Sequence, residues 1–345
     1  MSPLTIGIDS AGQQLPPPPS NPATATPARV SESVRRTSHL NASWPEGRGG
    51  PMMLQGGARD LVTTASGTSI AAAATMTAAI ENRMVVSMSA TPAHAHAEVL
   101  VGAKGGGGFR ARLRAELAEE FAAGAPLYFL LDDVAAMTLI GGFAWHLWPL
   151  PPSDQGADRK NLAIRDMADI CSGFRSDGGP IARQRAGVVM GHNIAAAVDV
   201  VDRQDPLSWH DVPPPAPQTP CMRRRRRVDV QAHGAEYRID AMFRDAMWSP
   251  EGVETVVHEY ALAATVDAAS MILTDIEATA RVLPFAECPA AAANVTRLIG
   301  QPMSKLRDSV LEIITGTSCC THLNDMLRAL AEVPVLAAHL EANVA

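Results

Sequence analysis

The chain has 345 residues, of which 47% are hydrophobic, so it can bury a sizeable core in two domains or one large one. Charged residues make up 19% and the formal net charge is −7, which argues against a general nucleic-acid binder, while 4% aromatic residues disfavour a surface for stacking bases or sugars. Five cysteines, an odd number, argue against a disulfide framework and predict a reducing, cytoplasmic compartment.

The N-terminal region, residues 1–30, predicts a disordered leader, because the run Pro16–Pro19 lies among small residues and no basic-then-apolar signal peptide is present. The most apolar stretch, residues 125–150, contains Asp132 and Asp133, and these charges disfavour a membrane span. We therefore expect a soluble protein that does not contact a membrane.

Two parts of the sequence resemble each other in the order of short landmarks. Ala58-Arg59-Asp60 corresponds to Phe243-Arg244-Asp245, and Leu130-Leu131-Asp132-Asp133 corresponds to His322-Leu323-Asn324-Asp325. Arg59 and Arg244 are 185 residues apart, Asp133 and Asp325 are 192 residues apart, and further landmarks have similar spacings. We predict an N-terminal repeat at 31–147, a proline-rich connector at 148–222 with a short helix at 161–174, and a C-terminal repeat at 223–345.

The C-terminal repeat predicts strands followed by helices. Strands at 226–230 and 237–243 flank the turn His233-Gly234, and strands at 255–266 and 271–283 form a hairpin. Helices are expected at 290–299, 304–315 and 321–340. The fold class is therefore α+β, with two related sheet-plus-helices repeats packed about a pseudo-twofold axis like a fused dimer. The basic run 223–227 is interpreted as a solvated edge, where charges block strand aggregation. The aspartates of the repeated landmark are interpreted as helix caps or as contacts between copies.

Four residues at the ends of predicted elements are candidate metal ligands: His258, Cys288, Cys320 and His322. Imidazole and thiolate are donors that zinc prefers. Because a helix N-terminus lowers a thiol pKa, Cys320 is also a candidate reactive thiolate. Cys319 and Cys320 are adjacent in the sequence, so the pattern leaves open which of the two is the ligand. The competing interpretation is a set of buried structural cysteines with a histidine that faces solvent.

The N-terminal repeat lacks these ligands. Its positions equivalent to Cys320 and His322 hold Tyr128 and Leu130, and the part of the chain before Cys171 contains no cysteine. His94 and His96 lie near the equivalent of Cys288. This asymmetry favours one functional site, in the C-terminal repeat.

Several motifs of the C-terminal half resemble an uncharacterised family, the domain of unknown function DUF2889, over about residues 222–340. They include Val257-His258-Glu259-Tyr260, Pro284-Phe285-Ala286-Glu287-Cys288-Pro289 and Cys320-Thr321-His322-Leu323. The resemblance implies no known reaction. More distantly, the order of elements resembles the NifU/SufE-type sulfur-carrier and iron–sulfur scaffold fold, in which ligands come from a strand start, a loop after a hairpin and the last helix.

We therefore predict a zinc site in the C-terminal repeat. If the protein is a metal-dependent enzyme, we expect it to act in small-molecule catabolism. Three protein ligands and an open position would supply Lewis-acid chemistry, and four would make the site structural. The alternatives are a thiol-based sulfur carrier or iron–sulfur cluster accessory that uses Cys320, and a non-enzymatic interaction module with inert cysteines.

Overall fold

A computed structural model of the chain describes residue 7 and residues 13–92, 97–149, 167–188, 191–202, 204–216 and 218–342. His94, His96 and residues 161–166 of the helix expected at 161–174 lie outside the described residues. Residues 167–171 of the expected helix form turns and irregular structure instead. Within the end of that predicted helix, residues 172–174 form a short 3-10 helix.

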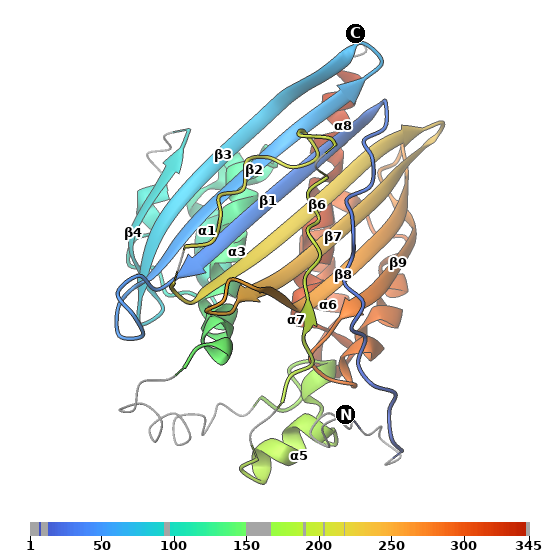
Figure 1. Cartoon of the computed structure of the whole chain (residues 1–345). Coiled ribbons are helices and arrows are strands. Elements are labelled where there is room, and N and C mark those ends of the chain that lie inside the picture. Colours follow the sequence, from blue (N-terminus) through green and yellow to red (C-terminus); the bar gives the residue numbers. More distant parts are fainter. Residues whose placement is uncertain are drawn as a thin grey trace.

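One long antiparallel sheet organises the molecule, with the strand order β4-β3-β2-β1-β6-β7-β8 and β9 beside β8 (Figure 1). The two-residue strand β5 also pairs with β8. The strands are β1 Ser33–Ser43, β2 Met52–Thr64, β3 Gly67–Glu81, β4 Met84–Thr91, β5 Ala195–Ala196, β6 Cys221–His233, β7 Glu236–Trp248, β8 Glu254–Asp267 and β9 Leu273–Val282. The β1–β6 pairing therefore joins the two halves of the chain into one sheet.

The helices that follow β4 and β9 cover one face of this sheet, which we call the inner face (Figure 1). The α-helices are α1 Phe109–Glu116, α2 Ala118–Ala122, α3 Pro126–Ile140, α5 Gly179–Arg185, α6 Leu306–Ile313, α7 Thr321–Ala329 and α8 Val333–Glu341. The 3-10 helices are η2 Ala97–Leu100, η3 Gly141–Leu147, η4 Ser172–Phe174, η5 Cys288–Leu298, η6 Met303–Lys305, η7 Gly316–Ser318 and η8 Leu330–Glu332. Apolar residues from alternate strand positions pack with these helices in two main cores, one in each half.

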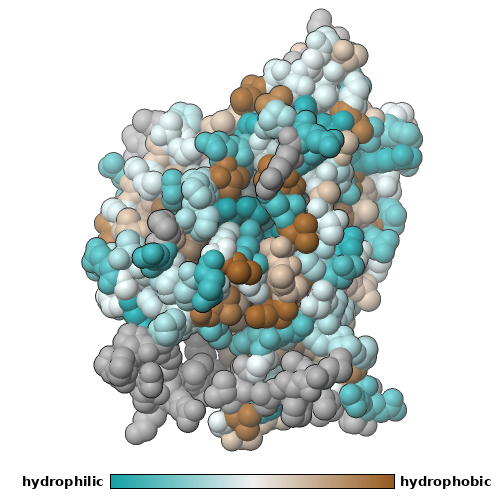
Figure 2. All heavy atoms as spheres, in the orientation of Figure 1, coloured by the Kyte–Doolittle hydropathy of each residue, from teal (hydrophilic) through white to brown (hydrophobic). Residues whose placement is uncertain are grey.

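The opposite face, the outer face, is crossed by extended chain from residues 13–30, 191–202 and 204–216 (Figure 1). We expected a disordered leader at 1–30, but residues 13–30 instead lie against this face. The Thr26 hydroxyl, for example, accepts a hydrogen bond from Trp209 Nε1 at 2.7 Å. Hydrophilic side chains gather near the middle of this view, with smaller hydrophobic groups around them (Figure 2).

The mixed α+β class and the predicted C-terminal hairpins are confirmed. The helix expected at 321–340 is divided into α7 and α8, because Pro334 has no amide hydrogen to donate and is tolerated in the first turn of a new helix. The segment expected to be helical at 290–299 is the 3-10 helix η5.

The interpretation of residues 223–227 as a solvated edge is wrong. Strand β6 lies in the middle of the sheet, paired with β1 and β7, and all five arginines of the run are at most 6% exposed. Arg224 and Arg226 lie on the inner face, where carboxylates of α3 and α7 reach them. The sequence of the strand alone does not show these distant partners.

One helical segment, Pro126–Leu147, is long and apolar enough to span a membrane, but 72% of its apolar window is buried inside the fold. Asp132 and Asp133 on this segment form ion pairs with arginines. These are the properties of the core helix of a soluble protein.

Candidate functional site

The candidate site begins with two neighbouring strands. Asp245 on β7 lies opposite His258 on β8, and the register shifts directly after this pair, leaving Val257 as an extra residue. Such a bulge redirects nearby side chains and is common beside functional sites. His258 is only 5% exposed, so the predicted solvent-facing histidine is wrong for this residue.

Helix α7 contributes the third residue of the candidate site. His322, in the first turn of α7, stacks on His258 with ring centroids 3.7 Å apart and an angle of 15° between the rings. Its Nε2 is 3.9 Å from Asp245 Oδ2. Asp245, His258 and His322 each offer one ligand atom, and these atoms all lie within 4.8 Å of one another.

Both imidazoles are neutral at pH 7. Burial lowers the pKa of His258 well below its usual 6.5, and the adjacent His322 ring adds to the effect. Burial, with the Arg224 charge, lowers the pKa of His322 to about 3. His258 Nδ1 and His322 Nε2 are buried and have no hydrogen-bond partner among the described residues. A neutral imidazole nitrogen without a partner is available to bind a metal ion.

Arg224 fixes the carboxylate of the site. Its Nε and Nη2 donate to the two oxygens of Asp245 at 2.9 and 3.0 Å. Its Nη1 donates to Asp133 and Asp325, each at 3.0 Å. The guanidinium that faces the site is thus shared among three carboxylates.

The thiols lie beside this group. Cys320 Sγ is 3.9 Å from His322 Nδ1. Cys288 is not among the group of Asp245, His258 and His322, and it lies near Cys320 and near Cys171 of the connector. A Cβ atom at Gly173 would be 2.7 Å from Cys288 Sγ and 3.9 Å from Cys171 Sγ. The structure therefore brings together His258, His322 and Cys320 and places Cys288 farther along the same core.

The prediction of a reactive thiolate at Cys320 omitted desolvation. Burial raises the Cys320 pKa, although the amides of Leu323 and His322 at the start of α7 act in the opposite direction. Burial also raises the pKa of Cys288 well above its usual 9.0 and that of Cys319 to about 11. The thiol form therefore predominates at these cysteines at neutral pH.

Sequence reasoning missed Asp245 and Tyr260 as members of this neighbourhood. Asp245 was seen only as part of a repeated landmark, and its place opposite His258 depends on the β7–β8 register. Tyr260, two residues after His258, is fully buried, and its hydroxyl forms a hydrogen bond with the Cys320 thiol. Burial, together with the nearby Cys320 and Cys288 thiols, raises the pKa of Tyr260 well above 10.

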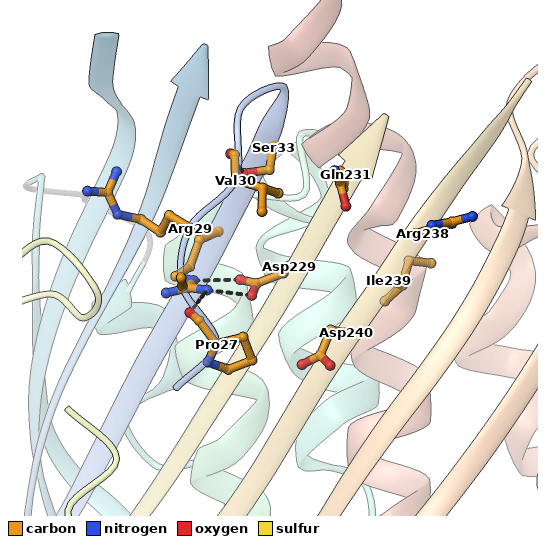
Figure 3. A pocket seen from close by; sticks show the side chains of 11 residues that line it. Pro27, Arg29, Val30, Ser33, Asp229, Gln231, Arg238, Ile239 and Asp240 are labelled. Carbon is orange, nitrogen blue, oxygen red and sulfur yellow. Dashed lines mark hydrogen bonds and ion pairs between the residues drawn. The ribbon is translucent and has the colours of Figure 1, made fainter. Parts of the chain in front are cut away.

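A pocket of about 180 Å³ lies elsewhere, on the outer face (Figure 3). It is lined by the Arg35–Asp229 ion pair together with residues that include Arg29, Arg238 and Asp240. The pocket is not part of the histidine site, which lies among the helices of the inner face.

Comparison with known proteins bears on the C-terminal part alone. Residues 222–336 match the model of a family described as "Protein of unknown function (DUF2889)". No curated protein and no solved structure matches the chain, so the more distant resemblance to the NifU/SufE-type fold has no support from these comparisons. The part of the chain that contains the candidate site, residues 222–336, is thus similar to the DUF2889 family.

Proposed function

We propose that the C-terminal part of this protein binds a divalent transition metal, with zinc as the first choice, between His258, His322 and Asp245. The observation that carries the proposal is the pair of buried, unpartnered imidazole nitrogens beside a carboxylate. Two imidazoles and one carboxylate form a donor set that binds zinc or iron(II) in proteins.

The Cys320 thiol decides the class of site. Without it, three protein ligands leave a position for water or a substrate, and a bound metal would supply Lewis-acid chemistry. With Cys320 as fourth ligand, the site would be closed and structural. Cys320 Sγ lies beside His322 Nδ1, so either arrangement needs only local side-chain movement.

The neighbouring Arg224 is compatible with a cation in this place. Asp245 has about four lone-pair sites, so it can accept from Arg224 and still offer one to a metal. Asp133 and Asp325 also hold Arg224, which reduces the repulsion that a bound cation would meet.

The sulfur-carrier alternative has less support than the metal site. A carrier needs a thiolate that its partner can reach, whereas Cys320 is 6% exposed and burial raises its pKa. A cytoplasmic location, and a small molecule rather than a nucleic acid or a membrane as partner, stay predictions.

We further propose that the chain is a duplicated unit in which the C-terminal copy keeps the site. The strand order β4-β3-β2-β1 is continued by β6-β7-β8-β9. Two four-stranded units that meet at the antiparallel β1–β6 pair are the arrangement expected of a fused dimer. Arg36 binds both oxygens of Asp60 on β2, as Arg224 binds both oxygens of Asp245 on β7. The shared contact makes Arg36 of the N-terminal copy the structural counterpart of Arg224 in the C-terminal copy.

The test is the metal content of full-length protein purified without a metal-affinity tag. We expect about one equivalent of metal per chain, and removal by a chelator should lower the melting temperature, because bound metal contributes folding free energy. His258→Ala and His322→Ala should each abolish most of the bound metal, and the double variant should melt little below either single variant.

His233→Ala is the matched control, because His233 lies exposed at the β6–β7 turn. It should keep the full metal content. Folded wild-type protein with near-zero metal would contradict the proposal, as would a metal content that His258→Ala and His322→Ala leave unchanged. In cobalt-loaded protein, loss of a sulfur-to-metal charge-transfer band in Cys320→Ser would identify Cys320 as a ligand.

A further inference from the structure

The outer face of the sheet contains a second polar cluster, remote from the histidine site. On β1, Thr37, His39 and Asn41 point to this face, in alternation with the inner-face residues Ser38 and Leu40. The register places His39 between Gly57 of β2 and Arg225 of β6, and it places Asn41 beside Arg223. Arg59 follows on β2, opposite Thr37.

A segment that we call the strap, residues 204–216, lies over this cluster (Figure 1). Arg59 Nη2 donates to the Leu207 carbonyl at 2.6 Å, and Arg223 Nη2 donates to the Pro213 carbonyl. Backbone carbonyls of the strap therefore serve as the acceptors for two buried guanidinium groups.

His210 occupies the middle of the cluster. Its Nε2 lies 2.6 Å from His39 Nδ1, and its Nδ1 lies 2.8 Å from Thr37 Oγ1. The ring fits above Gly57, where a Cβ atom would be 3.4 Å from His210 Cδ2 and 3.1 Å from His39 Cε1. The space over Gly57 thus exists because the strand has no side chain there.

The cluster has more positive than negative charge. Arg29, Arg227 and Arg244 on the same face form ion pairs with aspartate or glutamate at short distance. Among the described residues, Arg59 and Arg223 form no such pair, and Arg225 has only Glu254 at 3.4 Å. Asp205 lies near Arg59, and Glu254 and Asp199 lie near Arg223 and Arg225, so these carboxylates compensate part of the charge. The strap carbonyls satisfy hydrogen bonds but supply no negative charge to compensate the rest.

Three buried nitrogens in the cluster have no hydrogen-bond partner among the described residues: Arg59 Nε, Arg225 Nε and His39 Nε2. These three residues are 7%, 6% and 3% exposed. Burial, with the neighbouring Arg225, lowers the pKa of Arg223 to about 10, and burial lowers those of Arg59 and Arg225 as well. The cluster is therefore a buried cationic site with unused donors.

We propose that an oxyanion of the phosphate class binds under the strap, between Arg59, Arg223 and Arg225, in the place that His210 and the strap carbonyls occupy in this structure. Guanidinium forks match phosphate oxygens in geometry and charge, so a phosphate would satisfy the free donors and compensate the excess charge together. His210 is then a placeholder that leaves with the strap when the anion enters.

The test measures binding of inorganic phosphate to the full-length protein by calorimetry and by melting temperature, with sodium chloride at equal ionic strength as reference. We expect phosphate to raise the melting temperature above the chloride reference. Phosphate should also speed cleavage or hydrogen exchange in residues 204–216, because the strap must open. Acetate at equal ionic strength should have a smaller effect, since one carboxylate offers fewer acceptors than phosphate.

Two kinds of variant should act in opposite directions. Arg59→Gln and Arg223→Gln should each weaken phosphate binding about tenfold, the value of one charge-assisted hydrogen bond. His210→Ala should strengthen it, because the space over Gly57 is then vacant. Arg114→Gln is the matched control, since Arg114 pairs with Asp308 on exposed helix surface.

Equal effects of phosphate and chloride would overturn the proposal, as would phosphate binding that survives in the Arg59→Gln/Arg223→Gln double variant. Weaker binding in His210→Ala would also contradict it, because His210 would then be a ligand and not a placeholder. If a single arginine variant fails to fold, the response of His210→Ala and the exchange of the strap still decide the question.

Discussion

Strand β6 presents two different electrostatic environments on its two faces. On the inner face, Arg224 and Arg226 reach carboxylates of α3 and α7. On the outer face, Arg223 and Arg225 meet an asparagine, a carbonyl group and one glutamate. Adjacent residues of one basic run are therefore buried in a balanced ion network on one side and in an unbalanced cationic cluster on the other.

The inner network is balanced in number. It joins six arginines to six carboxylates across both halves of the chain: Arg36, Arg110, Arg224, Arg226, Arg307 and Arg328 with Asp60, Asp132, Asp133, Asp245, Asp325 and Glu332. Removing one member of a buried ion pair leaves an uncompensated charge, and this cost exceeds the net contribution of the intact pair. The network consequently ties the two halves together by penalising their separation.

The largest effect is expected when the halves are separated. A fragment of residues 222–345 keeps Arg224 and Arg226 but loses Asp133, and it exposes the edge of β6 that β1 covers. Free strand edges and unpaired buried charges both favour association. We expect the fragment to aggregate or self-associate in size-exclusion chromatography. A monomeric fragment with native-like stability would contradict a network that couples the halves.

A matched pair of substitutions compares the two faces directly. Burial alone would lower the pKa of Arg224, but Asp245, Asp133 and Asp325 raise it well above its usual value, so Arg224 stays charged. Arg224→Gln should lower the free energy of unfolding by about 3–5 kcal/mol, because three carboxylates lose a partner.

Arg223→Gln should change the free energy of unfolding by less than about 1 kcal/mol, because the loss of two hydrogen bonds is offset by relief of repulsion from Arg225. Urea denaturation of both variants measures the difference. If Arg224→Gln and Arg223→Gln lower the free energy of unfolding equally, the two faces of β6 do not differ in charge balance.

The sequence contains part of this picture. Turn residues and the enrichment of Val, Ile and Thr predicted the C-terminal hairpins, because these signals are local. The partners of the basic run were not predictable, since Asp133 lies 91 residues from Arg224 and Asp325 lies 101 residues from it. Residue type identified His258 and His322, while Asp245 required the strand register. The thiolate assignment of Cys320 considered the helix N-terminus and omitted desolvation, which is the larger influence on its pKa.

The last difference concerns pH, where His39 on the outer face and Asp325 on the inner face should respond in different ranges. Burial, with the charges of His210 and Arg223, lowers the pKa of His39 to about 2 on the outer face, against 6.5 when unfolded. The unfolded chain therefore takes up a proton that the folded chain does not, and stability falls as pH decreases below 6.5. On the inner face, burial opposes ionisation of Asp325, but Arg110 and Arg224 lower its pKa to about 2, so its contribution is lost only below about pH 4.

Each buried neutral histidine should then contribute about 1.4 kcal/mol per pH unit to the loss of stability below pH 6.5. His39→Asn should reduce the slope of unfolding free energy against pH between 6.5 and 4.5 by about this amount and leave the steeper region below pH 4 in place. His233→Asn, at the exposed β6–β7 turn, should leave the slope unchanged. Urea denaturation across this range measures the slopes. An unaltered slope in His39→Asn would show that His39 is protonated in the folded state, and the excess positive charge of the outer cluster would then be larger than the structure indicates.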